Sequence, residues 1–478
     1  MGFRNPLGCT NSDVYRIMGN YLCNYRCSKM DLHKLDISNI HYRRNCGCER
    51  NNGGCFTLPK KEESTMQKRK YSGVEWIGEI PEDWDIKRLK AVLCERNESN
   101  NPIKTDYILS LTNDRGVIPY DEKGDVGNKS KEDLSGYKLA YLNDIVLNSM
   151  NVIIGSVALS KYYGCVSPVY YMLYPRNPMD DVRYYNYIFQ TKEFQSKLKG
   201  YGNGIMEIRM RIQMSKLNTV ELPIPDATTQ TRIADFLDDK CGKIDRYIEK
   251  QQQTIDKLKE YKQAVITEAV RFRDGWTSCR LGYLAQFKNG LNYSGLSTDV
   301  EIKFLGVGDF QNHFMLNSKE MFSTLKFDGN MPEDLLLKNG DIVFVRSNGS
   351  KDLVGRSVLI DNVDYPLTYS GFCIRMRNIR QDIIQNKFLL YRFWSNEFRQ
   401  SLNQDSRGSN INNLNQELLS KFAVAFPVID EQKKIVKYLD AKCFEIDSAI
   451  SKQTSIIEKL TEYKKSLIYE AVTGKMEV

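Results

Sequence analysis

One long stretch of the sequence occurs twice, and this repeat constrains the fold more than any other feature. Residues 233–270 align without a gap to residues 435–472, and about half of the positions are identical. The copies are separated by 202 residues, the difference between positions 435 and 233. A repeat of this length predicts an architecture built from two similar halves.

A second pair of landmarks opens each half. Trp84-Asp-Ile-Lys-Arg-Leu89 and Trp276-Thr-Ser-Cys-Arg-Leu281 both have Trp five positions before Leu, with Arg directly preceding the Leu. Each half then passes through an Asp-Ile-Val run, which starts at Asp144 and at Asp341. The order along the chain is therefore a variable module, a repeated stretch, a second variable module and the second repeated stretch.

Both repeated stretches predict long helices that pair as a coiled coil. They contain good helix formers, and their apolar positions alternate by four and three residues, with Asp226 and Asp430 as start signals near the beginning of the helices. The predicted seam residues are Ile244, Ile248, Gln251, Ile255, Leu258, Ile446, Ile450, Gln453, Ile457 and Leu460. A polar Gln at the same seam position in both copies predicts a device that fixes the helix register.

The length of the helices favours pairing between them. Forty residues at 1.5 Å per residue make a rod of roughly 60 Å, too long for one small module to cover. We therefore expect the two helices to pack on each other in antiparallel fashion, around a pseudo-twofold axis. The alternative is that each is an amphipathic helix packed on its own module.

The variable modules have the composition of a mixed sheet with long loops. Short alternating runs predict strands, and residues 184–198 and 386–402 predict helices. The expected fold class is α+β, with two similar α/β modules separated by two long antiparallel coiled-coil helices. The expected boundaries are residues 66–225 and 273–427 for the modules, and residues 226–272 and 428–478 for the helical spacers.

Polar and glycine-rich loops in both modules are the candidate functional residues. Amide, hydroxyl and guanidinium groups bind base edges and phosphates, and glycines let a backbone approach closely. Solvated surface loops are the alternative for any single residue, but equivalent loops in both halves favour contact with DNA. The candidates are Asn148, Ser149, Asn151, Tyr162, Tyr163, Asn203, Arg209, Arg211, Arg346, Ser347, Asn348, Lys351, Arg407, Asn410, Asn412 and Asn413.

The sequence lacks the motifs of enzymes that act on DNA. It has no G-x-x-x-x-G-K-[ST] phosphate loop and no Asn-Pro-Pro-aromatic run. Beyond residue 65 the one histidine is His313, so no Ser/His or Cys/His nucleophile pair is expected there. Pro81-Glu-Asp-Trp-Asp-Ile-Lys87 resembles a nuclease pattern, but the second half lacks these acids at the same landmark, which favours a structural role. We expect no catalytic site.

Residues 1–65 differ from the rest of the chain. They hold Cys9, Cys23, Cys27, Cys46, Cys48 and Cys55, half of the 12 cysteines, and show no helical or strand period. A zinc site built from Cys23 and Cys27, with Cys46, Cys48 or His41, is one interpretation, but the spacings fit no common zinc pattern. The favoured interpretation is a poorly ordered extension that precedes a start at Met66, with no metal site.

Charge and hydropathy set the remaining bounds. The formal net charge of +8 permits phosphate binding without requiring it. The start has no apolar signal region, and no apolar run approaches the roughly 18 residues needed to cross a bilayer. The single cysteines after residue 65 are typical of a reducing compartment. We therefore expect a cytoplasmic protein that does not contact the membrane.

Residues 71–478 resemble the specificity subunit of a type I restriction-modification system. Ser72-Gly-Val-Glu-Trp-Ile-Gly-Glu-Ile-Pro-Glu-Asp-Trp84 looks like the opening of these subunits, and the repeated stretches look like their helical spacers. Two departures are the extra N-terminal residues and Thr228-Thr229-Gln230, where the second copy has the more typical Asp430-Glu-Gln432.

The resemblance implies two target-recognition modules, each reading one half of a bipartite target in double-stranded DNA. It implies two methyltransferase subunits and motor-nuclease restriction subunits as partners. These partners would bind S-adenosylmethionine, ATP and Mg²⁺, so no cofactor is expected in this chain. The predicted methyltransferase docking surface includes the helix residues Lys243, Glu249, Lys250 and Lys257.

Two other functions remain open from the sequence. One is a helical interaction or scaffold protein without a DNA role, and the other is a DNA methyltransferase or nuclease hidden in the divergent modules.

Overall fold

The computed structural model describes residues 68–124, 132–201, 211–292, 300–311, 313–327, 331–348, 353–404 and 414–478. They belong to one compact unit, Gln67–Val478. The extension predicted at residues 1–65 lies outside the described residues. Within the described part of the chain, no helix is long and apolar enough to cross a membrane.

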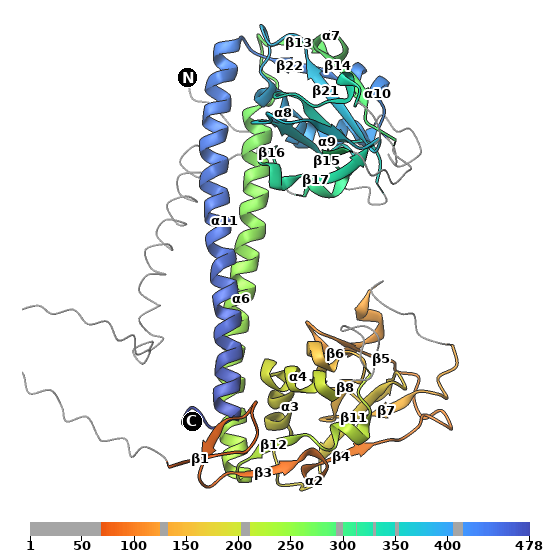
Figure 1. Ribbon diagram of the computed structural model, residues 1–478, viewed down its shortest axis with the longest axis vertical. Helices are drawn as coiled ribbons and strands as arrows, with labels where there is room; N and C mark the ends of the chain where they lie inside the picture. The colour runs from red at the N-terminus through yellow and green to blue at the C-terminus, as the bar shows by residue number, and fades with distance from the viewer. Residues whose placement is uncertain are drawn as a thin grey trace, which may run out of the picture. The chain divides into compact units, whose positions relative to one another are not determined.

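Two long helices run side by side in opposite directions (Figure 1). Helix α6 spans Ala227–Ala269 and helix α11 spans Ile429–Val472. Lys262, in the last quarter of α6, contacts Asp447 in the first half of α11 at 2.7 Å. Lys464, in the last quarter of α11, contacts Asp245 in the first half of α6 at 2.7 Å. These reciprocal contacts require antiparallel pairing, so the expected packing of the two helices is confirmed.

The seam residues lie along this helix pair. All of those named from the sequence are buried or half-buried, and Ile244, Ile255 and Ile446 are less than a tenth exposed. The oxygen Oε1 of Gln453 is buried without a hydrogen-bond partner among the described residues. The seam therefore contains one polar atom whose burial is not compensated.

The two helices begin differently. The Asp226 carboxylate accepts a hydrogen bond from the backbone N–H of Thr229 at 3.0 Å, which caps α6 as predicted. Helix α11 begins one residue after Val428, whose side chain cannot accept a hydrogen bond. Asp430, the start signal of the second copy, lies in the first turn of the helix and not at its cap.

The first module is built on a four-stranded antiparallel sheet with the strand order β4-β11-β8-β9. These strands are β4 (Leu93–Arg96), β11 (Tyr170–Pro175), β8 (Ile145–Asn148) and β9 (Val157–Leu159). Smaller pairs are β1 (Arg69–Tyr71) with β2 (Glu79–Pro81), β5 (Leu109–Thr112) with β6 (Gly116–Pro119), and β7 (Lys138–Ala140) with β10 (Gly164–Val166). Strand β3 (Asp85–Arg88) pairs with β12 (Glu221–Ile224), which joins the beginning of the module to its end.

The second module repeats this plan with additions. Its main sheet has the order β14-β21-β18-β19-β16, formed by β14 (Ala285–Asn289), β21 (Cys373–Asn378), β18 (Ile342–Val345), β19 (Ser357–Ile360) and β16 (Met315–Leu316). A second sheet has the order β17-β15-β20, formed by β17 (Ser323–Phe327), β15 (Val300–Leu305) and β20 (Leu367–Tyr369). Strand β13 (Thr277–Arg280) pairs with β22 (Ala423–Phe426) and joins the two ends of this module.

Short helices complete the modules. In the first they are α2 (Leu89–Val92), α3 (Val182–Gln190), α4 (Lys192–Leu198) and α5 (Met214–Leu217). In the second they are α7 (Leu281–Leu284), α8 (Asn386–Trp394), α9 (Asn396–Gln404) and α10 (Gln416–Lys421). The helix predicted over residues 184–198 is broken at Thr191, and the one over 386–402 is broken at Ser395. At both breaks the backbone is extended, and the hydroxyl donates to the carbonyl three residues back.

The Asp-Ile-Val runs place a buried aspartate in front of the equivalent strands β8 and β18. Asp144 is 1% exposed and accepts a hydrogen bond from Arg96 at 2.9 Å, while Asp341, also 1% exposed, accepts one from Arg377 at 2.8 Å. Burial raises the pKa of Asp144, and the hydrogen bond from Arg96 opposes that shift. The aspartates are equivalent, but Arg96 lies on β4 and Arg377 on β21.

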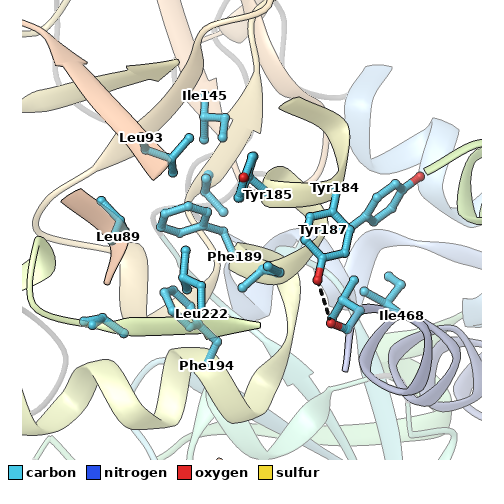
Figure 2. Close-up of a cluster of buried hydrophobic side chains, with 14 of the residues drawn as sticks. Leu89, Leu93, Ile145, Tyr184, Tyr185, Tyr187, Phe189, Phe194, Leu222 and Ile468 are labelled. Carbon is cyan, nitrogen blue, oxygen red and sulfur yellow. Dashed lines mark hydrogen bonds between the residues drawn. The ribbon is translucent and has the colours of Figure 1, made fainter. Parts of the chain in front are cut away.

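Each module packs against both long helices. One hydrophobic cluster joins the first module to Ile233 and Leu237 in α6 and to Ile468 in α11, and Figure 2 shows Ile468 beside the tyrosines of α3. A second cluster joins the second module to Ile266 at the end of α6 and Leu439 at the start of α11. The distance between the two contact regions is therefore set by the length of the helices, roughly 60 Å over forty residues.

Candidate nucleic-acid interface

In each module, three segments meet at the carboxyl end of the central strand. In the first, the carbonyl of Ser149, directly after β8, accepts a hydrogen bond from the N–H of Ile212 at 2.9 Å. The Ser149 hydroxyl donates to the carbonyl of Val169, directly before β11, at 2.7 Å. The loop after the strand, the turn before β11 and the segment entering α5 are thus held together.

The second module repeats this arrangement at equivalent positions. The carbonyl of Arg346, directly after β18, accepts a hydrogen bond from the N–H of Leu414 at 2.8 Å. The N–H of Arg346 donates to the carbonyl of Phe372, directly before β21, at 2.7 Å. The loop after the strand is therefore bonded to Leu414, which follows the candidate residues Arg407 to Asn413. The sequence analysis had treated these two segments separately.

The candidate residues of the first module have different environments in this loop cluster. Ser149 is fully buried, and its hydroxyl is used within the module. The Asn148 side-chain oxygen accepts a hydrogen bond from Met150 N–H at 3.0 Å, while Asn151 is half-buried. Arg211 is exposed beside Ile212. Asn203 and Arg209 lie outside the described residues.

The second loop cluster has an arginine at the place of Ser149 and an exposed aromatic side chain beside it. Arg346, Ser347 and Asn348 are half-buried at its surface, and Arg346 Nη1 donates to the carbonyl of Gly371 at 3.4 Å. Phe372 is 63% exposed directly beside them, a position that the sequence analysis did not single out. The candidates outside the described residues are Lys351, Arg407, Asn410, Asn412 and Asn413.

Tyr162 and Tyr163 lie at the opposite end of strand β8, away from the loop cluster. Their turn follows Ser160, whose N–H donates to the carbonyl of Asp144. The ring of Tyr163 contacts that of Tyr141, with centroids 5.0 Å apart. The Tyr141 hydroxyl donates to the Glu98 carboxylate at 3.0 Å, which raises the pKa of Tyr141. These tyrosines form a separate surface.

The structure identifies side chains that dock the modules onto the helices, and the sequence analysis had noted only that Gln230 pairs with Gln432 in the repeat. Gln230 Oε1 accepts from the N–H of Asp181, the N-cap residue of α3, at 3.1 Å. Gln432 Oε1 accepts from the N–H of Gln385, the N-cap residue of α8, at 2.9 Å. Identity at the repeat shift was the signal that could have marked both glutamines as structurally important.

A second pair of contacts between module and helix also occurs at equivalent positions in the two halves. The hydroxyl of Tyr187 on α3 donates to Asp238 at 2.6 Å, and that of Tyr391 on α8 donates to Asp440 at 2.9 Å. Asp238 and Asp440 occupy the same position in the two copies of the repeat. Each module is thus held at the start of the long helix that follows it.

The helices also hold the modules from their other ends. Tyr184 on α3 donates to the carbonyl of Val472, the last residue of α11, at 3.0 Å. Arg392 on α8 donates to the carbonyl of Val270, directly after α6. Each module therefore contacts the start of one helix and the end of the other, which makes the helix pair a spacer between the two loop clusters.

The residues predicted to form a docking surface for a partner lie on the spacer. Lys243, Glu249, Lys250 and Lys257 are all exposed on α6. The Lys243 ammonium contacts the carboxylate of Asp239, one turn earlier on the same helix, at 2.8 Å. Their exposure leaves these charges accessible along the helix.

The run from Pro81 to Lys87 serves the fold. Pro81 ends strand β2, and residues from Asp85 form strand β3 against β12. The ring of Trp84 contacts that of Tyr184 in the core, with centroids 6.5 Å apart, and Lys87 pairs with Asp85 at 3.3 Å. This geometry agrees with the structural interpretation of the run.

Comparisons with known proteins identify relatives over both modules. The chain is 29% identical over 283 residues to the type I restriction enzyme StySPI specificity subunit of Salmonella potsdam, a match covering 55% of this chain and 59% of that relative. It is 24% identical over 431 residues to the putative type I restriction enzyme MjaX specificity subunit of Methanocaldococcus jannaschii, covering 84% of this chain and 96% of the relative. The first match thus spans less than two thirds of the relative's length.

A solved structure shares the fold. It is described as "Structural basis underlying complex assembly and conformational transition of the type I R-M system", and it matches with a TM-score of 0.64 at 12% sequence identity. The match covers 83% of this chain and 99% of the solved one. The α+β fold with two modules on paired helices is therefore confirmed.

The family model described as the type I restriction modification DNA specificity domain matches twice. The matched residues are 81–260 and 273–461, so each match contains one module and most of the helix that follows it. The resemblance inferred from the opening segment and the repeated stretches is thereby confirmed: the chain belongs to the type I restriction modification DNA specificity family.

Proposed function

We propose that this chain is the DNA-reading subunit of a type I restriction-modification complex and performs no catalysis itself. The observation that carries the proposal is the duplicated loop cluster, in which Ile212 N–H bonds Ser149 and Leu414 N–H bonds Arg346 at equivalent sites. Two such clusters, each on its own module, suit the reading of two separate half-sites in double-stranded DNA.

The spacer explains a fixed gap between the half-sites. The modules contact α6 near Gln230 and Val270, roughly 60 Å apart along a helix. This length is somewhat under two turns of duplex DNA, at about 34–36 Å per turn. A rigid separation of this order converts into a set number of base pairs, as it does in dimeric repressors.

The partners follow from the same proposal. Two methyltransferase subunits dock on the spacer helices, where Lys243, Glu249, Lys250 and Lys257 are exposed, and they bind S-adenosylmethionine for adenine methylation. Restriction subunits bind ATP and Mg²⁺ and supply translocation and cleavage. The complex acts on DNA in the cytoplasm, and this chain holds no cofactor of its own.

Binding to duplex DNA at increasing salt, with the methyltransferase partner present, tests the DNA role. Each phosphate contact releases counterions, so the logarithm of the affinity should fall steeply and linearly with the logarithm of the salt concentration. A flat response would favour a scaffold without a DNA role. Methyl transfer from labelled S-adenosylmethionine, or cleavage with Mg²⁺, by the purified chain alone would contradict the non-catalytic assignment.

A further inference from the structure

A pocket of about 230 Å³ lies where the second module meets helix α6. It is many times the roughly 10–15 Å³ that a cavity needs to hold one water molecule. Its wall includes Gln263 from α6, Asn396 at the start of α9, and two residues of the second module, Arg356 and Ser357. It is therefore large enough for a small polar group.

The charged side chains that line this pocket are arginines. They are Arg356 and Arg399, and the lining contains no aspartate or glutamate. Arg356 Nη1 donates to the carbonyl of Gln311 at 2.9 Å, and Arg399 Nη1 donates to the carbonyl of Val354 at 2.9 Å. A guanidinium has five N–H donors, so the backbone bond to Gln311 positions the Arg356 guanidinium and leaves other donors of that group over. Such an arrangement favours an anionic ligand.

The strongest sign of a missing ligand is Ser357. The residue is 2% exposed, and its Oγ has no hydrogen-bond partner among the described residues. Alternation along β19 places its side chain on the same face as Leu359, toward helix α8, which is the side of the pocket. A buried hydroxyl without a partner costs free energy, and an anion accepting from it would remove that cost.

The start of helix α9 adds a further favourable element. Asn396, its first residue, lines the pocket, and α9 is nine residues long. The N–H of Asn396 itself donates to Thr267 Oγ1 at 3.1 Å, so the terminus contributes through the helix dipole, which favours negative charge. The helix terminus, the arginines and the buried hydroxyl thus favour the same class of ligand.

The first module does not have this chemistry. The pairing of β8 with β9 and of β18 with β19 makes Ser156 the counterpart of Arg356. Gln195 follows the helix break of the first module by four residues, as Arg399 does in the second. Its side chain packs against Gly155, since a Cβ on that glycine would lie 3.2 Å from Gln195 Nε2. The cationic pocket is therefore a property of the second module and not of the shared fold.

We propose that the pocket formed by Arg356, Arg399 and Ser357 binds a phosphate group. It lies at the base of the second loop cluster, because Val345, the residue before Arg346, bonds the backbone of Arg356 at 2.8 Å. One source is a backbone phosphate of DNA in the second half-site, which rests on the proposed function. The other is free phosphate, which does not.

Titration of the full-length chain with inorganic phosphate, at constant ionic strength in chloride, tests the pocket without DNA. Arg356→Gln should weaken binding at least about tenfold, since it removes charge-assisted hydrogen bonds. Ser357→Ala should also weaken it while keeping the folded state, because its hydroxyl holds nothing else. The matched control is Arg380→Gln, an exposed arginine of the same module that pairs with Asp382 at 2.9 Å.

A second measurement identifies the source of the phosphate. If DNA supplies it, Arg356→Gln should lower the slope of log affinity against log salt by about one for duplex DNA, and Arg380→Gln should not. Loss of inorganic phosphate binding with an unchanged slope assigns the pocket to free phosphate. If neither Arg356→Gln nor Ser357→Ala changes phosphate binding relative to the control, and the slope is also unchanged, the proposal is overturned.

Discussion

The ammonium of Lys262 lies 2.7 Å from the carboxylate of Asp447 on the other long helix, and the internal repeat reproduces this contact with the chain order reversed. Shifting both residues by the repeat length gives Lys464 and Asp245, which also lie 2.7 Å apart. One ion pair and its symmetry mate thus bridge the two helices toward opposite ends. These two ion pairs are related by the pseudo-twofold axis that the sequence predicted.

Reversing one charge should show that this pair couples the helices. Asp447→Lys places two ammonium groups together and should lower the free energy of unfolding by about 1 kcal/mol, while the swap Lys262→Asp with Asp447→Lys should recover most of it. The control is Lys243→Asp, which disrupts an exposed pair within one helix and should have a smaller effect. Urea unfolding of the full chain measures all of these, and additive effects in the swap would refute the coupling.

The same substitution should have opposite effects at two glutamines of α11. Gln432 is fully buried, and its side chain bonds backbone groups of Ile383, Gln385 and Pro427. Gln432→Leu would leave these backbone groups without this hydrogen-bond partner, which should lower the free energy of unfolding by about 3 kcal/mol. Gln453 Oε1 is buried without a partner, so Gln453→Leu should be neutral or stabilising by up to about 1 kcal/mol. Unfolding midpoints of the two variants give the comparison, and equal losses would contradict it.

The register role of the seam glutamines has its own test. Changing Gln251 and Gln453 together to Leu should raise stability but loosen the helix register. The measurement is the gap between half-sites methylated by the assembled complex. An unaltered single gap in the double variant would argue against a register role for these residues.

Substitutions at the two helix N-caps should change stability in opposite directions. Val428→Ser should stabilise α11 by about 0.5–1 kcal/mol, because Ser there and Glu431 three residues later form a capping box. Asp226→Ala should destabilise α6 by about 1 kcal/mol. Thermal unfolding at neutral pH measures both, and a destabilising Val428→Ser would contradict the assignment of that cap.

The Asp226 cap should also depend on pH in a defined direction. The hydrogen bond from Thr229 N–H lowers the pKa of Asp226 below its ordinary value in the folded chain. The contribution of this carboxylate to stability is therefore complete above the ordinary aspartate pKa and is lost as the pH falls through the lowered pKa. Stability curves of the parent and Asp226→Ala should converge in that acidic range, and a constant difference would contradict the assignment.

Arginines of the loop clusters should affect DNA binding, whereas the buried serine should not. Arg346→Ala and Arg211→Ala should each weaken binding and reduce the salt slope by about one if they contact phosphates. Ser149→Ala should leave the slope unchanged but lower stability by about 1 kcal/mol, because it removes the bond to Val169. Salt titrations in the presence of the methyltransferase partner measure the slopes. The reverse pattern would place the interface elsewhere.

The repeat made the paired helices predictable, because the spacing of apolar residues within each copy indicates a helix and the two copies together indicate a helix pair. Heptad spacing marked the seam, and Asp226 marked the start of α6. At α11 the start signal Asp430 is the second residue of the helix, because the chain turns into the helix at Val428. The breaks at Thr191 and Ser395 were missed because hydroxyl groups that bond the preceding turn compete with the helix.

Side-chain partners from distant strands could not be predicted from the sequence. The aspartate of each Asp-Ile-Val run is visible in the sequence, but Asp144 takes Arg96 from β4, and Asp341 takes Arg377 from β21. Only the order of the strands in each sheet shows that both arginines lie beside the aspartate that precedes the equivalent strand. Likewise, Ser149 carries a suitable group for DNA but is fully buried, and burial depends on segments far along the chain.

Exchange of the second module tests the central claim most directly. Residues 274–427 would be replaced by the corresponding module of another member of the family, and the sites methylated by the assembled complex would be mapped across a genome. The account predicts that one half of the target changes, while the other half and the gap between them stay the same. A change in both halves, or in neither, would contradict it.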